Sequence, residues 1–291
     1  MGKPLVTIAL AVKNASSIVR FALSSSFAQT YEPKEVIAAD GMSVDGTLEE
    51  LRRWPLRAIL SDEGRGLGHA RQLLLQEARG EYVLWVDADH VLPPDFLEKQ
   101  VSFMEQHPRV GAVEPLLYPL DGGHVGFVEG LALLVLYARR AKSGKLRTSG
   151  TPATLFRRSA AMEAGGFDER FRVAGEDQAL TREMARRGWE FAVNPQAWAY
   201  HISRSSWLQL WKEYRGWGSA AKELERIYPG YVTTWKVLPP ATIVSGMLNA
   251  IRVARLTGSA YSLLVPLHTV YKRAAWAYGY FVGDRLTMPV P

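Results

Sequence analysis

Two aspartates separated by one residue, Asp87 and Asp89, come directly after a short apolar run that begins at Tyr82. A run of this length, rich in valine and tryptophan, is typical of a buried strand in a parallel sheet. In open α/β sheets the ligand crevice lies beyond the carboxyl ends of such strands. Alternate residues of an extended chain point to the same side, so both carboxylates can face one ion. This pattern of oxygen ligands predicts a Mg²⁺ or Mn²⁺ site.

A second acidic pair, Glu176 and Asp177, follows Gly175. One interpretation of this pair is catalytic, since carboxylates can do acid–base chemistry. The pair also has a purely structural explanation, because the helix dipole favours acidic residues at helix N-termini. Asp87 and Asp89 also have a structural explanation, because many acidic pairs simply end a strand at a solvated loop. Neither acidic motif therefore identifies a function without the rest of the chain.

A glycine-rich loop at 64–68 precedes a segment that we expect to be helical, 69–78. Its spacing matches neither the Walker loop nor the dinucleotide-binding fingerprint. One interpretation is an ordinary turn. The other is a loop that lets backbone N–H groups, or Arg65 and Arg71, approach a phosphate at the helix N-terminus. The spacing alone leaves both interpretations open.

Alternating strands and helices must position these groups. The expected strands and helices of the first ninety residues are, in order, strand 5–12, helix 16–28, strand 35–39, helix 48–53, strand 58–60, helix 69–78 and strand 81–86. This alternation predicts βαβ units, hence an α/β fold with a mostly parallel sheet that helices cover on both faces. The turn-forming segment 40–47 follows the second strand.

The composition of the chain restricts the class of protein and the kinds of partner that it can have. The chain has 291 residues, of which 47% are hydrophobic and 22% charged, as in a globular protein with a sizeable core. It contains no cysteine, which excludes disulfides and thiolate metal sites and fits a reducing compartment. A formal net charge of +6 suits nucleic acid, anionic lipid or phosphorylated ligands without choosing among them.

Several segments of the first half together resemble the nucleotide-binding half of a family 2 glycosyltransferase with the GT-A fold. They are 6–14, 40–47, 66–71 and 80–89. The segment 87–97 is especially similar to the cellulose-synthase-like branch of that family. Two positions depart from the family pattern, which usually has proline in place of Ala11 and often asparagine in place of Gln72.

The resemblance implies that the donor substrate is a nucleoside diphosphate sugar. Asp40 would contact its base, while Asp87 would lie near the ribose and the metal. Asp89 would be the direct metal ligand. Asn14, Arg65 and Arg71 complete the donor-binding residues that we expect.

The second half carries further segments of the same resemblance, in the same order as in the family. The segments 150–158 and 165–169 match the acceptor side, with Gly150 and Phe156 as expected acceptor contacts. The segment 175–180 resembles the acidic catalytic motif, which implies that Asp177, together with Glu176, is catalytic. The family inverts the anomeric configuration of the transferred sugar.

His201 follows a short expected strand at 191–193. A lone histidine is more often a packed or capping residue than a ligand. In related GT-A enzymes, however, a histidine after the acceptor region can complete the metal or diphosphate site, so we include His201 beside Asp87 and Asp89. The segment 209–217 faintly resembles the Q-x-x-R-W signature of processive synthases. Its spacing differs from that signature, yet it makes Arg215 and Trp217 candidate acceptor contacts.

Beyond 203 the chain has the pattern of an amphipathic helix. Residues of its expected apolar face recur every three or four positions: Trp207, Trp211, Tyr214, Gly218, Ala221 and Leu224. Basic residues elsewhere on the helix suit an anionic membrane interface. The segments 237–251 and 259–283 are largely apolar, but Pro239-Pro240 interrupts the first and His268, Lys272 and Arg273 the second. The alternative is a packed helical subdomain that covers the sheet.

We therefore expect a GT-A catalytic domain at 1–202, made of a nucleotide-sugar half (1–90) and an acceptor half (91–202). An amphipathic interfacial helix at 203–230 and a helical membrane-associated segment at 231–291 follow. A transmembrane hairpin is one arrangement of that last segment, and Arg252 and Arg255 would then mark its cytoplasmic turn.

The expected function is inverting, metal-dependent transfer of a hexose in glycan biosynthesis. Mannose from GDP-mannose is favoured over another sugar from a UDP-sugar. The expected acceptor is linked to a lipid such as polyprenyl or dolichyl phosphate. The protein would associate with the membrane, with its catalytic domain facing the cytoplasm, and would have no nucleic-acid partner.

Three alternatives remain at this stage. A soluble family 2 transferase would use a saccharide acceptor. A sugar nucleotidyltransferase would need a glycine-rich, basic triphosphate loop near the N-terminus, which the segment 10–14 does not provide. A non-catalytic protein that binds nucleic acid or lipid would explain the positive charge without needing Asp87, Asp89 and Asp177.

Overall fold

The structure is a computed structural model that describes residues 2–121, 123–143, 146–232 and 239–282. The chain divides into two compact units, which are described separately below. The first unit contains residues 1–118, 137–172 and 176–201, and the second contains 119–136, 173–175 and 202–291. The second unit thus includes, besides the C-terminal part of the chain, a segment before 137 that the sequence placed in the catalytic domain.

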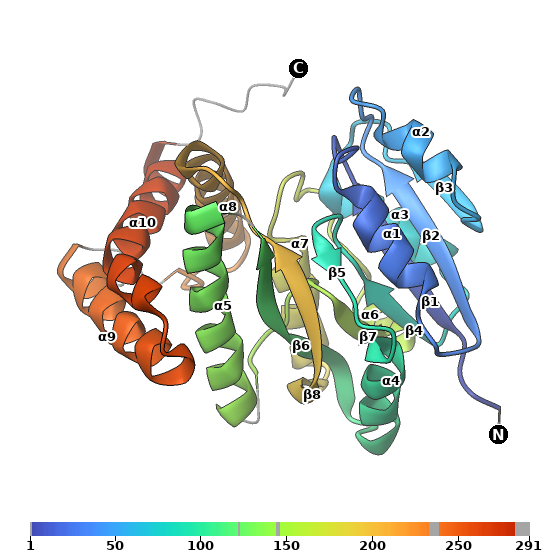
Figure 1. The fold of residues 1–291 in the computed structure, drawn as a ribbon. Coiled ribbons are helices and arrows are strands. Elements are labelled where there is room, and N and C mark those ends of the chain that lie inside the picture. The colour runs from blue at the N-terminus through green and yellow to red at the C-terminus, as the bar shows by residue number, and fades with distance from the viewer. Residues whose placement is uncertain (1, 122, 144–145, 233–238, 283–291) are drawn as a thin grey trace. The chain divides into compact units, whose positions relative to one another are not determined.

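Eight strands of the described chain form one mixed sheet (Figure 1). Their order across the sheet is β3-β2-β1-β4-β7-β6-β8-β5. Their bounds are β1 Val6–Val12, β2 Lys34–Asp40, β3 Ala58–Ser61, β4 Tyr82–Trp85, β5 His90–Val91, β6 Val110–Asp121, β7 Thr154–Arg157 and β8 Glu190–Ile202. Strands β1 to β4 pair in parallel, as expected. The later strands differ, because β7 is antiparallel to both β4 and β6, and β5 is antiparallel to β8.

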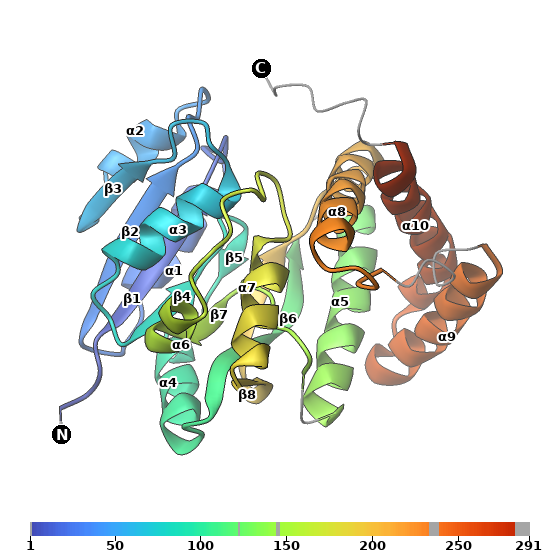
Figure 2. The same cartoon turned by 180° about the vertical axis from the view of Figure 1, so that it is seen from behind.

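Helices cover both faces of this sheet within the first unit. Helices α1 and α4 lie on the face toward the viewer in Figure 1, and α3, α6 and α7 on the face seen in Figure 2. The bounds are α1 Val19–Phe27, α2 Thr47–Arg52, α3 Leu67–Glu77, α4 Phe96–Gln106, α6 Arg158–Glu163 and α7 Glu176–Arg186. The α/β fold with helices on both faces is therefore confirmed, with antiparallel strands added in the second half.

The alternation of side chains along β1 explains the two faces. Ile8 and Leu10 are completely buried in the core beneath α1 and α4, whereas Ala9 belongs to the core beneath α3, α6 and α7. A strand with apolar residues on both sides is stable only between two layers of helices. Each fully buried leucine or isoleucine contributes about 1.5–3 kcal/mol, so this strand fixes the centre of the fold.

The second unit is helical. Its elements are α5 Gly123–Ser143, whose last turns belong to the first unit, α8 Trp207–Ile227, α9 Pro239–Thr257, the 3₁₀ helix η2 Ala260–Leu264 and α10 Val265–Val282. Val128, Leu131 and Val135 of α5 form a small core with Val253 of α9 and Val265. A packed helical subdomain was the alternative interpretation of this region.

A buried charge joins three helices of this unit. Glu129 of α5 accepts a hydrogen bond from the Tyr214 hydroxyl of α8 at 2.6 Å and pairs with Lys272 of α10 at 2.5 Å. Burial alone would raise the pKa of Glu129, but the positive charge of Lys272 holds it below its usual value. Lys272, which interrupts the apolar pattern of its segment, therefore has a partner inside the helical unit.

The face of α8 that the sequence placed at a membrane interface packs against α10 instead. Trp207 and Trp211 contact Tyr271 with ring centroids 4.8 and 5.4 Å apart. At Gly218 and Gly279 the two helix backbones come so close that a Cβ atom on either glycine would overlap a carbonyl oxygen of the other helix. The spacing of apolar residues was read correctly as one helical face, but the partner of that face is a helix.

No helix in the described residues is long and apolar enough to cross a membrane. The transmembrane hairpin is therefore not found among the described helices. Residues 237, 238 and 283 of its two segments lie outside the described residues.

The close approach of α8 and α10 generates a test. We expect Gly218→Leu and Gly279→Leu each to destabilise the protein by about 3 kcal/mol, the upper end of the cost of overpacking, because the overlapped atoms are backbone. Gly216→Ala is the matched control, since its nearest neighbour, a Val173 methyl group, would be 3.6 Å away. It should be stabilising by up to about 1 kcal/mol, the difference in helix propensity. Thermal unfolding followed by circular dichroism measures all three, and equal melting temperatures would contradict the packing described.

Candidate functional site

A carboxylate and two imidazoles meet at the edge of the sheet where β5 pairs with β8. Asp89 follows β4, and the pairing of β5 with β8 places His90 opposite His201. Asp89 Oδ1 lies 2.9 Å from His90 Nδ1, and Asp89 Oδ2 lies 3.6 Å from His201 Nε2. One ligand atom from each of the three residues lies within 4.8 Å of the others, so the group could hold a metal ion.

The electrostatics of this cluster suit a divalent cation. Burial alone would raise the pKa of Asp89, but hydrogen bonds and charge from His201 and His90 hold it well below its usual value. Asp89 is therefore ionised, as a metal ligand must be. Within the described chain, the buried Nε2 atom of His90 has no hydrogen-bond partner, which leaves one nitrogen of this ring available to an ion.

Two differences from expectation concern this cluster. His90 was not among the expected ligands, because its role depends on a two-residue strand whose pairing with β8 is not visible in the sequence. Asp87 was expected at the metal, but it lies outside the group of three. Its Oδ1 atom instead accepts a hydrogen bond from Arg71 Nη2 at 2.9 Å.

Arg71 of α3 connects the end of β4 with the start of α7. Its side chain is buried and forms ion pairs with Asp87 and with Glu176. The guanidinium therefore lies among carboxylates and not at the exposed helix terminus where the sequence suggested a phosphate contact. Burial raises the pKa of Glu176 to about 7, against the opposing effect of the Arg71 charge. Glu176 itself is 1% exposed, so its place is in this buried pair.

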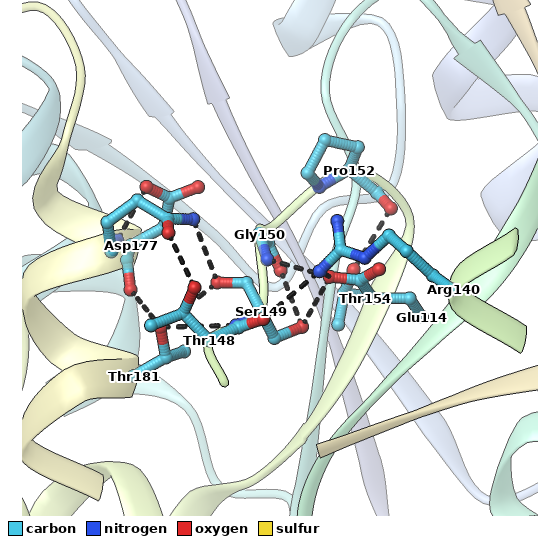
Figure 3. Close-up of polar contacts among 10 residues, drawn as sticks. Glu114, Arg140, Thr148, Ser149, Gly150, Pro152, Thr154, Asp177 and Thr181 are labelled. Carbon is cyan, nitrogen blue, oxygen red and sulfur yellow. Dashed lines mark hydrogen bonds and ion pairs between the residues drawn. The ribbon is translucent and has the colours of Figure 1, made fainter. Parts of the chain in front are cut away.

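Asp177, the neighbour of Glu176 in the first turn of α7, is partly exposed. Burial of its carboxylate raises its pKa, whereas the charge of Arg71 and backbone hydrogen bonds from Gln178 and Thr151 lower it. Gly150 lies beside this carboxylate (Figure 3), and a Cβ atom there would be 3.4 Å from Asp177 Oδ2. A raised pKa makes this partly exposed carboxylate a stronger base, which suits it to accept a proton.

Phe156, the other expected acceptor contact of the first unit, is completely buried on β7. It packs in the core beneath α3, α6 and α7, so its ring has no surface to offer a ligand. Arg215 and Trp217 belong to the second unit. There Arg215 lies over the Tyr278 ring at 5.8 Å, and Trp217 is 40% exposed.

The end of β2 offers a polar group to a ligand. Asp40 is 5% exposed, and one of its oxygens accepts a hydrogen bond from the backbone of Ser43 at 3.0 Å. Its other oxygen has no hydrogen-bond partner in the described part of the chain. Asn14 braces the same loop, because its side-chain oxygen accepts a hydrogen bond from the backbone of Val44 at 3.0 Å. These contacts leave the Asp40 carboxylate able to accept a further hydrogen bond.

The glycine-rich loop before α3 has a structural role. The backbone N–H groups of Leu67 and Gly68 donate to the carbonyl oxygens of Arg172 and Phe171, both at 2.9 Å. A Cβ atom at Gly68 would overlap the backbone at Asp168. These N–H groups are therefore engaged by the chain itself, and the interpretation as a phosphate-binding loop is not supported for them. The Arg65 side chain, also expected at a phosphate, pairs with Glu169.

The cluster of Asp89, His90 and His201 predicts metal binding that can be measured without an activity assay. We expect His90→Ala and His201→Ala each to weaken Mn²⁺ binding at least about tenfold, since each removes a ligand from a group of three. Calorimetric titration of the whole protein with Mn²⁺ is the measurement. His107→Ala, which changes the exposed histidine directly after α4, should bind like the unchanged protein. Unaltered binding by His90→Ala would remove His90 from the site.

Comparison with known proteins agrees with this architecture. The family model Glycosyl transferase family 2 matches residues 7–164. Poly-beta-1,6-N-acetyl-D-glucosamine synthase of Staphylococcus aureus (strain COL) is 26% identical over 228 residues, which cover 75% of this chain and 55% of that protein. The chain thus spans about half the length of the curated relatives it matches.

Solved structures share the fold. The mannosyltransferase PcManGT from Pyrobaculum calidifontis, in complex with GDP-Man and Mn2+, has a TM-score of 0.65 at 21% identity, covering 96% of this chain and 88% of that one. S. aureus TarS 1-349 in complex with UDP-GlcNAc has a TM-score of 0.56 at 16% identity, covering 96% and 91%. Since the family model matches more than half of the chain and the fold is shared, the protein belongs to glycosyl transferase family 2 and has the GT-A fold.

Proposed function

We propose that the protein is an inverting, metal-dependent glycosyltransferase that moves a hexose from a nucleoside diphosphate sugar to a lipid-linked acceptor. The observation that carries the proposal is the buried Arg71, which bridges Asp87 and Glu176. Asp87 is two residues from the metal-ligand candidate Asp89, and Glu176 is next to Asp177. Arg71 thereby links the segment of Asp89, which could hold a metal ion at the leaving diphosphate, to the segment of Asp177, which could activate an acceptor.

The residues divide the work of the reaction. Asp89, His90 and His201 would hold a divalent ion, which supplies charge stabilisation to the leaving diphosphate. Asp177 would remove the proton of the acceptor hydroxyl as it attacks the anomeric carbon. Attack from the face opposite the leaving group inverts the anomeric configuration. Asp40 would accept a hydrogen bond from the donor base, and both guanine and uracil present N–H groups to such an acceptor.

The donor that we favour is GDP-mannose with Mn²⁺. The support is the fold shared with PcManGT, whose structure contains GDP-Man and Mn2+. Imidazole ligands also fit Mn²⁺ better than Mg²⁺, which prefers oxygen ligands and retains waters. The second candidate donor is UDP-N-acetylglucosamine, favoured by the similarity to the S. aureus synthase and to TarS. Thermal shift with a panel of GDP- and UDP-sugars in Mn²⁺ discriminates between them.

The lipid-linked acceptor is supported by the surface of the second unit. Apolar residues on one face of α9 and on the neighbouring η2 and α10 are exposed: Ile243, Val244, Met247, Leu248, Ile251, Leu263 and Leu267. Exposed apolar patches on soluble folds commonly mark interaction surfaces, and the exposed Arg255 suits an anionic lipid surface. On this proposal the protein is membrane-associated, with its catalytic unit facing the cytoplasm. A polyprenyl or dolichyl phosphate acceptor would be presented there.

The role of Asp177 predicts a change in turnover and in its pH dependence. A general base must be ionised, so turnover should fall as the pH is lowered through the raised pKa of Asp177. Asp177→Asn should reduce kcat by roughly 10²- to 10⁴-fold and abolish this acidic limb while donor affinity holds. Release of nucleoside diphosphate from the preferred donor is the assay. Asp95→Asn, on the exposed start of α4, is the control, and a collapse of donor affinity in Asp177→Asn would reassign Asp177 to donor binding.

The exposed face of α9 predicts binding to anionic bilayers. We expect the full chain to co-sediment with vesicles that contain phosphatidylglycerol, and the double variant Val244→Glu/Met247→Glu to lose most of that binding, because it places charge on the apolar face. Met162→Glu, at an exposed methionine of the first unit (41%, against 55% for Met247), should bind as before. Equal binding by all three proteins would exclude this face as the contact, and absence of binding by the full chain would reject membrane association.

A further inference from the structure

A carboxylate in the middle of the sheet has no role in the site described so far. Glu114 lies on β6 with no exposed surface, in an otherwise apolar stretch of the strand. Burial raises the pKa of Glu114, opposed by the positive charge of Arg140. Burying a charge is costly unless it is paired and hydrogen-bonded, so an apolar residue would be the simpler choice for packing alone.

One oxygen of Glu114 is the centre of a set of hydrogen bonds (Figure 3). Oε1 accepts from Arg140 Nη2 at 2.8 Å, from the Ser149 hydroxyl at 2.9 Å and from the backbone N–H of Gly150 at 2.9 Å. Arg140 also donates to the carbonyl oxygen of Thr148 at 3.0 Å. Glu114 and Arg140 together therefore hold three consecutive residues of the loop that precedes β7.

The same loop is bonded to the first turns of α7. The Thr148 hydroxyl donates to the Gln178 side chain at 2.8 Å, and the Gln178 amide donates to the Ser149 carbonyl oxygen at 3.3 Å. The backbone N–H of Ser149 donates to the Thr181 hydroxyl at 3.3 Å. These bonds fix the loop against the helix that carries Asp177.

The loop also meets the Asp177 carboxylate directly. A Cβ atom at Gly150 would be only 3.4 Å from its Oδ2 atom, and the backbone of Thr151 is among the groups that lower its pKa. The orientation of this carboxylate therefore depends on where 148–151 lies, and that depends on Glu114. The unbroken sequence of contacts runs from β6 through the loop to the first turn of α7.

We propose that Glu114 is a positioning residue that sets the geometry of Asp177 by holding the loop 148–151. This inference rests on the proposed function, in which Asp177 is the general base. Rate is sensitive to such geometry, since a misplacement of about 1 Å can cost about 100-fold. Glu114 touches neither substrate nor metal in this role, so it acts on turnover and not on donor binding.

The test compares Glu114→Ala with Glu114→Gln in the full chain. Glu114→Ala removes the acceptor of three hydrogen bonds, and kcat should fall at least about tenfold while the donor KM stays unchanged. Glu114→Gln keeps an oxygen that can accept the same bonds, so turnover should recover to within a few-fold of the unchanged protein. Full activity of Glu114→Ala, or no recovery in Glu114→Gln, would overturn the inference.

The pH profile separates positioning from a loss of stability. The negative charges of Glu114 and Asp177 each disfavour ionisation of the other, so Glu114→Gln should shift the acidic limb of kcat to lower pH. Thr181→Val, which breaks the loop's bond to α7, should also reduce kcat. Thr7→Val removes a buried hydroxyl on β1 that bonds Glu35 of β2, outside this set of hydrogen bonds, and it should lower the melting temperature without changing kcat. Loss of turnover that simply follows melting temperature across all four variants would contradict the proposal.

A double mutant distinguishes this inference from the proposed function. In the Asp177→Asn background, Glu114→Ala should reduce kcat by less than about twofold, because the group that it positions is already gone. Loss of turnover in Asp177→Asn, together with unreduced turnover in Glu114→Ala, would reject only the role of Glu114. An additive loss in the double mutant would do the same. Unchanged turnover in Asp177→Asn would reject the proposed base and this inference with it.

Discussion

The interaction on which the site depends is the buried ion pairing of Arg71. Arg71 is 5% exposed, and its guanidinium requires charged partners because an isolated charge in a protein interior is strongly disfavoured. Asp87 and Glu176 provide them. Since Asp87 follows β4 and Glu176 begins α7, the same requirement that stabilises Arg71 also holds the two acidic motifs together. Segments that are 89 residues apart in sequence are thereby fixed in one site.

What the sequence predicted well is whatever depends on local pattern. The parallel strands of the first half form within a few residues of where their apolar runs indicate, and Asp87 and Asp89 follow a buried strand as expected. The family and the fold class are confirmed for the same reason, since the motifs that carry the resemblance lie at the ends of these strands. The positions of Asp40 at the end of a strand and of Asp177 at the start of a helix follow from the strand and helix boundaries alone.

What the sequence did not predict depends on contacts between distant segments. His90 becomes a ligand candidate only through the pairing of a two-residue strand with β8, and no periodicity announces so short a strand. The glycines at 66 and 68 resemble a ligand-binding loop, yet they allow the chain at 168–172 to pack closely. On α8 the apolar spacing is the same for a membrane and for a neighbouring helix. Pattern alone therefore could not identify α10 as the partner of that face.

Buried charges hold the first turn of α7 from two directions. Arg71 anchors Glu176 from the side of α3 and β4, and Glu114 anchors the loop against Asp177 from the side of β6. Buried ion pairs are weak sources of stability, since apolar residues of similar volume often serve a core as well or better. What they contribute is a defined orientation of the bonded groups, because hydrogen bonds to a fixed charge allow few alternative geometries. If Asp177 is the general base, as we propose, these charges around one turn serve to fix its carboxylate.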